Sequence, residues 1–220
     1  MGLLGENLRV EVNFALGVYD RDSGELLEYR EVHNVCTNTG RTWISQLFGS
    51  SDYTQSPPTP HTTEKATYIG FGCGGVLQTS NNFAATQAEL TTVTALEDPV
   101  PLSVNGTLRT YLKTVDSQSA GSVYFPGNYR TVFIVDVLES EISFAGNTTR
   151  TSAYGVGTSV PISEAGLYLN TALPTYNHVN PVPAGQADPA AANRMICYNT
   201  FEPVTITPNV VVRAEWELRV

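Results

Sequence analysis

Charged side chains are scarce in this chain of 220 residues: Asp, Glu, Lys and Arg make up 15% of it, against roughly 25% in an ordinary soluble domain. The net charge is -9, and Lys65 and Lys113 are the only lysines. Duplex nucleic acid is therefore not an expected partner, because neutralising phosphates requires clustered Lys and Arg. A surface so poor in charge must be covered largely by Thr, Ser, Asn, Gly and partner protein, which first indicates a structural assembly.

Long apolar runs and targeting signals are also missing. No stretch approaches the roughly 20 apolar residues that span a bilayer, and residues 1–6 lack a cationic region followed by an apolar block. Gly2 is followed by Glu6, where a myristoylation signal requires Ser or Thr. We therefore expect a protein that is made and folded in a cytoplasm and has no membrane partner.

Cysteine is rare, and the three residues Cys36, Cys73 and Cys197 lie far apart without a C-x-x-C pair. Their odd number favours buried free thiols over a disulfide framework. A chain of this length buries roughly 70% of its unfolded surface, so it does not need disulfides to fold.

Alternating apolar residues are the clearest pattern that is present. Residues 8–18 alternate with period 2, residues 20–24 supply turn chemistry, and residues 26–35 return, which predicts a β-hairpin. The last segment, 210–220, alternates as cleanly, with Trp216 on its apolar face. We therefore expect Trp216 in the core.

The remaining segments favour an antiparallel β protein. One short helix is predicted from a cap at Asn38 or Thr39 to Phe48, with Trp43 on its apolar side, and a second over residues 82–90. Further strands are expected at 66–73, 91–94, 107–115, 122–125, 131–144, 162–169 and 195–207. Because long helices between strands are missing, the pattern predicts a mainly β fold, an antiparallel β-sandwich or a barrel-like domain with two short helices.

No break in composition divides the chain, so residues 1–220 are predicted to form a single domain. Two long loops interrupt it at 49–65 and 172–192, and both are rich in proline. Loops of this length are usually functional. We expect them to contact neighbouring subunits.

A glycine motif resembles a nucleotide-binding fingerprint. Gly70, Gly72 and Gly75 match G-x-G-x-x-G after a strand. A dinucleotide site needs a helix at that turn to meet the pyrophosphate, and residues 76–82 do not predict one. The expected structure is a glycine bend where two strands or a partner approach closely.

Other residue types that could carry chemistry are scattered. The three histidines lack metal-ligand spacing, and neither a G-x-S-x-G elbow nor a Cys/His nucleophile pairing occurs. Two carboxylate pairs remain, Glu97 with Asp98 and Glu139 with Glu141. The second pair could share a strand face, as glycoside chemistry requires, but a solvated face or a subunit contact is its expected role. These residues are His33, His61, His178, Glu97, Asp98, Glu139 and Glu141. We therefore predict no catalytic, cofactor-binding or metal-binding residues, and no enzyme.

The segment 160–169 places a carboxylate inside a strand. Alternation puts Ile162, Glu164, Gly166 and Tyr168 on one face. Burying such a carboxylate is costly unless it is paired. The candidate partners are Arg41, Arg130, Arg150 and Arg194.

Four segments occur in an order that resembles a loose family of tailed-bacteriophage virion proteins. They are an N-x-x-x-N-x-G helix start at 34–40, an I-G-x-G-x-G-like strand at 69–75, an E-A-G-L strand at 164–167, and a C-terminal strand that bears Trp216. The resemblance covers residues 31–220. Cys73 and Gly74 stand where Thr or Ser and Gly are common in the family.

The resemblance implies a non-enzymatic structural component of the tail, baseplate or capsid exterior, present in many copies in the virion. Other virion proteins and further copies of the same chain would be its partners, since symmetric repeated contacts hold such assemblies together. One alternative is a host-surface recognition module that binds glycans, and another is a capsid decoration or cement protein. A wall-degrading hydrolase is a third class, which clearing of a peptidoglycan gel would reveal.

Overall fold

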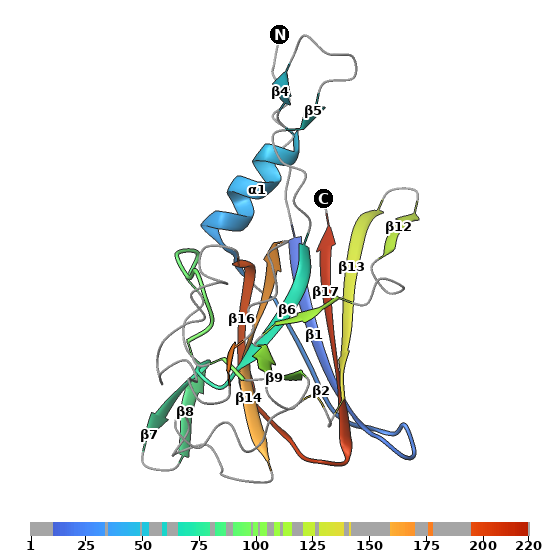
Figure 1. Cartoon of the computed structure of the whole chain (residues 1–220), viewed down its shortest axis with the longest axis vertical. Helices are drawn as coiled ribbons and strands as arrows, with labels where there is room; N and C mark the ends of the chain where they lie inside the picture. Colours follow the sequence, from blue (N-terminus) through green and yellow to red (C-terminus); the bar gives the residue numbers. More distant parts are fainter. Residues whose placement is uncertain are drawn as a thin grey trace.

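The computed structural model describes residues 11–33, 35–48, 50–52, 59–60, 66–79, 82–86, 90–97, 99–100, 102–104, 108–110, 112–115, 121–125, 128–138, 141, 159–169, 176–177 and 195–219. Within these residues the protein is mainly β, with two large antiparallel sheets and one helix (Figure 1).

The first sheet contains five strands in the order β12-β13-β17-β1-β2. β1 pairs along its whole length with β17 and turns back into β2, so the predicted N-terminal hairpin is confirmed. Its turn is held by the Asp20 carboxylate, which accepts a hydrogen bond of 2.8 Å from the backbone N–H of Ser23. The strands are β1 (Glu11–Asp20), β2 (Leu26–His33), β12 (Gly121–Phe125), β13 (Asn128–Val137) and β17 (Val210–Arg219).

The second sheet also contains five strands, in the order β11-β6-β14-β16-β3. β14 lies at its centre between β6 and β16. The strands are β3 (Val35–Cys36), β6 (Ala66–Gly72), β11 (Leu112–Thr114), β14 (Val160–Leu169) and β16 (Met195–Ile206).

The core lies between these two sheets. Trp216 of β17 is fully buried, as predicted, and its ring centroid lies 4.5 Å from that of Phe14 in β1. Phe14 also stacks on Phe201 of β16, with ring centroids 5.5 Å apart. Since the two sheets are separate and packed face to face, the fold is sandwich-like and the barrel alternative is wrong.

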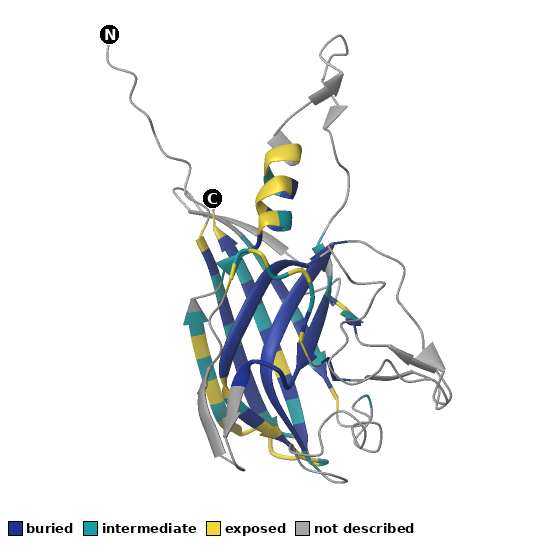
Figure 2. Cartoon of the chain, turned by 90° about the vertical axis from the view of Figure 1, so that its left-hand side faces the viewer, coloured by how far each residue is buried: buried dark blue, intermediate teal, exposed yellow. Residues whose placement is uncertain are grey.

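The helix α1 (Asn38–Phe48) confirms the first predicted helix. It rises from one end of the sandwich (Figures 1 and 2). Trp43 is buried and packs with the partly buried Ile44 against the main core. Among the described residues no helix is long and apolar enough to cross a membrane.

Two segments outside the large sheets differ from the sequence-based expectations. The second helix, predicted at 82–90, is wrong for the described first part of the segment, because β8 (Asn82–Thr86) forms a hairpin with β7 (Val76–Thr79). Residues 91–94 do not form the predicted strand: 91 and 92 form a turn, and 93 and 94 are irregular.

The two predicted loops are not wholly irregular. The loop at 49–65 contains β4 (Ser50–Asp52) paired with β5 (Thr59–Pro60). The loop at 172–192 contains β15 (Tyr176–Asn177), which pairs with β10 (Leu108–Thr110), and β10 pairs in turn with β9 (Leu102–Val104). The predicted strand at 107–115 is therefore divided, since β11 belongs to the second large sheet.

Candidate functional site at a buried glutamate

The centre of the second sheet is buried on both faces. All ten residues of β14 are buried. A β-bulge between Ile162 and Glu164 shifts the alternation of the strand, so Ile162 joins Ala165 and Leu167 in the main core. The prediction that Ile162 shares a face with Glu164 is therefore wrong. The bulge leaves Ser163 and Glu164 facing the outer side of the sheet.

Glu164 is fully buried there, and its carboxylate accepts three hydrogen bonds among the described contacts. Oε1 accepts a hydrogen bond of 3.1 Å from the backbone N–H of Gly74. Oε2 accepts one of 3.1 Å from the backbone N–H of Glu97 and one of 3.0 Å from the hydroxyl of Tyr198. Such bonds to a charged acceptor compensate for the loss of water. The predicted arginine partner stays a prediction. Arg41 is exposed, and Arg150, Arg194 and the side chain of Arg130 lie outside the described residues.

Tyr198 is a donor to Glu164 over the whole physiological pH range. Burial, followed by the negative charge of Glu164, raises the pKa of the Tyr198 hydroxyl far above its ordinary value. Tyr198 belongs to a second apolar cluster on this side of the sheet, whose other buried members are Leu96, Leu112, Tyr168 and Met195. The carboxylate is therefore enclosed by apolar side chains and by the segment that carries Leu96.

The glycine motif ends against the same strand. The backbone N–H of Gly75 donates a hydrogen bond of 3.1 Å to the Ser163 hydroxyl. A Cβ on Gly75 would lie 1.9 Å from the Ser163 carbonyl oxygen, so only glycine fits this approach. β6 continues through this bend into strand β7 rather than into a helix. The predicted glycine bend between closely approaching strands is confirmed.

The start of α1 joins the same sheet. Thr37, which is fully buried, caps the helix by accepting a hydrogen bond of 3.1 Å from the backbone N–H of Gly40. Its hydroxyl donates one of 2.6 Å to the carbonyl of Met195 in β16. The cap is therefore Thr37 and not the predicted Asn38 or Thr39, because only a hydroxyl at position 37 reaches both partners.

The segment 90–97 links the helix start to the buried carboxylate. The carbonyl of Thr91 accepts a hydrogen bond of 2.7 Å from the backbone N–H of Asn38, and Glu97 donates to Glu164. We call this set of contacts the Glu164 junction: Glu164, Ser163, Tyr198, Thr37, residues 74–75 and residues 90–97. In it, both oxygens of the carboxylate are engaged in fixing backbone segments.

Among the other candidate residues, the described side chains of Glu97 and Glu141 do not bond Glu164 in the contacts that the structure describes. The side chain of Glu97 is exposed. Glu141 lies beyond the end of β13, so the predicted strand face of paired carboxylates is wrong; it contacts Lys113 and accepts a bond from the N–H of Leu138. His61, His178, Asp98 and Glu139 lie outside the described residues, as does the side chain of His33. No cluster of three or more metal-ligating side chains occurs in the described part of the chain.

The sequence did not predict that two of the cysteines lie next to each other. Cys36 in β3 lies directly opposite Cys197 in β16. The two residues are far apart in the chain, and only the register of the strands brings them together.

Comparisons of the chain with protein-family models, with curated proteins and with solved structures found no match. The resemblance to virion proteins therefore remains a prediction from the sequence.

Proposed function

We propose that this protein is a non-enzymatic structural subunit of a bacteriophage virion, which makes repeated protein–protein contacts in the tail, the baseplate or the capsid exterior. The observation that supports the proposal is the Glu164 junction. The helix start at 34–40, the glycine strand at 69–75 and the E-A-G-L strand at 164–167 meet there. Segments on which the resemblance depends thus support one another in the fold.

The chemistry of the junction fits a structural role better than a catalytic one. A general acid or base must reach the proton that it transfers. The Glu164 side chain is fully buried, and both of its oxygens accept hydrogen bonds within the protein. Its role in the proposal is to hold residues 74–75 and 90–97 on the second sheet.

A second copy of the chain is the partner proposed for the outer edge of the first sheet. β2 is the outermost strand on this side of the described sheet. Leu26, Leu27 and Tyr29 are about half exposed there, at 48, 55 and 49%. A bulge in the β1–β2 pairing lies beside Leu27, and edge bulges disfavour strand-to-strand pairing. We therefore propose that two copies of the chain contact each other through these apolar side chains and not by pairing their β2 strands.

Sedimentation of the full chain, alone and mixed with virion components, tests the proposal. We expect a defined oligomer or incorporation into particles. The variant Leu27→Lys should weaken self-association, whereas Leu138→Lys, which changes a leucine of similar exposure (47%) outside β2 and outside the Glu164 junction, should not.

A strict monomer that never enters particles would overturn the proposed function. Binding of the free protein to host cells would support the glycan-recognition alternative instead. If both variants associate as the wild type does, the contact does not involve the β2 edge.

A further inference from the structure

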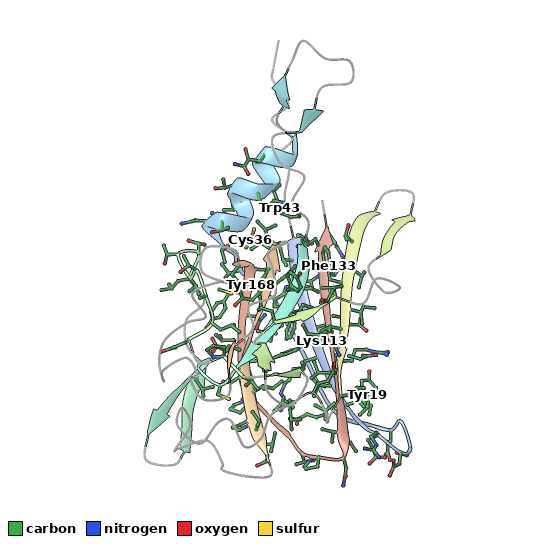
Figure 3. The ribbon with its side chains drawn as sticks, viewed as in Figure 1. Tyr19, Cys36, Trp43, Lys113, Phe133 and Tyr168 are labelled. Atoms are coloured by element: carbon green, nitrogen blue, oxygen red, sulfur yellow. The ribbon has the colours of Figure 1, made fainter. Side chains whose placement is uncertain are left out.

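Two of the three cysteines form a facing pair at the edge of the second sheet. Cys36 is opposite Cys197 in the antiparallel register of β3 and β16, and both are free thiols. Figure 3 shows Cys36 at the foot of α1. Cys73, the third cysteine, is buried in the main core.

The hydrogen-bond pattern fixes the type of this pair. The backbone N–H of Thr37 donates a bond of 3.0 Å to the carbonyl of Ile196, so a hydrogen bond joins the strands at the position next to Cys36 and Cys197. Pair types alternate along an antiparallel ladder, which makes Cys36 and Cys197 a non-hydrogen-bonded pair with Cα atoms about 4.5 Å apart and side chains close together. A disulfide requires a Cα separation of roughly 4.4 to 6.8 Å. The backbone therefore already has the spacing of a disulfide.

The two thiols differ in reactivity. Cys36 is partly exposed and directly precedes the start of α1. A hydrogen bond from Cys197 lowers the pKa of the Cys36 thiol, and the charge of Arg41 adds to this effect against the opposing effect of burial. Burial raises the pKa of the Cys197 thiol well above its ordinary value. Cys36 thus has the features of an attacking thiolate and Cys197 those of a resolving thiol.

We propose that Cys36 and Cys197 are an oxidation site that a hydroperoxide converts into an intrachain disulfide. The Cys36 thiolate attacks one peroxide oxygen, so that an S–O bond forms, the O–O bond breaks and the leaving oxygen is protonated to water or an alcohol. The sulfur of Cys197 then attacks the Cys36 sulfur, the S–S bond forms, and the sulfenic oxygen leaves as water with the Cys197 proton. Both sulfurs are oxidised and the peroxide is reduced.

The disulfide would tie the foot of α1 to β16 of the second sheet. β3 is only two residues long and leads directly into the helix. A covalent link between positions so distant in the chain removes much conformational freedom from the unfolded protein. This inference does not rest on the proposed virion role.

Mass spectrometry of the full chain tests the proposal directly. The reduced protein is treated with hydrogen peroxide, denatured and alkylated. We expect one alkylated thiol, at Cys73, and a proteolytic fragment in which Cys36 is joined to Cys197. Three alkylated thiols, a bond that involves Cys73 or a second chain, or a Cys36 sulfinic acid beside a free Cys197 would each overturn the proposal.

Thermal melting tests the effect on the fold. The oxidised wild type should melt roughly 5–15 °C above the reduced protein, and a dithiol reductant should reverse the shift. The variant Cys36→Ser should melt at the same temperature before and after peroxide. Equal melting temperatures of the oxidised and reduced wild type would show that the disulfide does not stabilise the attachment of the helix to the sheet.

Discussion

The two sheets of the sandwich differ in how many of their faces are buried. The first sheet buries one face, and the residues of β17 alternate between buried and more exposed positions. The second sheet buries both faces at its centre, where all of β14 and the first seven residues of β16 are buried (Figure 2). Its polar groups must therefore find partners within the protein, whereas those of the first sheet can meet water.

The ionic groups of the two sheets illustrate this difference. On the first sheet, Arg213 and Asp136 form a two-pronged contact of 2.7 and 2.8 Å, but their side chains are 45 and 39% exposed. Such a pair contributes at most about 1 kcal/mol. On the second sheet, Glu164 is fully buried. Loss of one partner there leaves a buried polar group unsatisfied, which costs more than an exposed pair contributes.

The largest expected effect comes from the core that the sheets share. Trp216→Ala should lower the free energy of unfolding by about 3–5 kcal/mol, because it empties the space beside Phe14. Urea denaturation of this variant and of the control Glu217→Ala measures the difference. Equal unfolding midpoints would contradict the assignment of Trp216 to the core between the sheets.

Alanine in place of glycine should affect the two sheets unequally. Gly75→Ala brings a Cβ against the backbone oxygen of Ser163, so we expect a loss of roughly 1–3 kcal/mol. In the control Gly17→Ala, in the first sheet, the three atoms nearest the new Cβ all belong to the side chain of Tyr19, which can move aside. A loss for Gly17→Ala as large as that for Gly75→Ala would refute the close approach at the Glu164 junction.

The helix cap should have a smaller effect, and one that a conservative change restores. Thr37→Ala removes a hydroxyl that bonds both Gly40 and Met195, so the free energy of unfolding should fall by about 0.5–2 kcal/mol. Thr37→Ser should recover most of this loss. The control Thr42→Ala removes an exposed hydroxyl that bonds only the carbonyl of Asn38 in the described contacts. If Thr37→Ala melts like Thr42→Ala, Thr37 is not the cap.

The smallest effect should be that of the exposed ion pair, and it should depend on pH. The hydrogen bond from Arg213 lowers the pKa of Asp136 below its ordinary value. Its contribution to stability, under about 1 kcal/mol, is therefore fully present above the pKa of an unfolded aspartate, about 3.9, and is lost as the pH falls through the lowered value. Melting of Asp136→Asn should differ slightly from that of the wild type at pH 7 and converge with it in acid. A difference that grows in acid would be inconsistent with this pairing.

The sequence predicted the first sheet better than the second, because only the first sheet leaves one face open to water. Where one face meets water, as in β1 and β17, alternation reveals the strand and its buried side. Residues 82–90 contain Ala, Gln, Glu and Leu, which favour a helix, yet pairing with β7 makes the first part of this segment a strand. Tertiary contacts there override local propensity.

The partners of Glu164 could not be predicted from residue types. Two of them are backbone N–H groups, at Gly74 and Glu97, which every residue except proline carries. The need for partners was visible in the sequence, because a carboxylate stood inside an apolar strand. The bulge after Ile162, which determines where the carboxylate points, left no recognisable signal.

The central claim is that Glu164 holds distant backbone segments on the second sheet, and amide hydrogen exchange measured by NMR tests it most directly. In Glu164→Gln, the new amide NH₂ should replace Oε1, which accepts one bond among the described contacts, and leave an oxygen at Oε2, which accepts two of them. We therefore predict that exchange at the Gly74 amide accelerates about tenfold or more, less so at Glu97, and not at Phe14 in the first sheet. Unchanged exchange at both Gly74 and Glu97 would contradict the account.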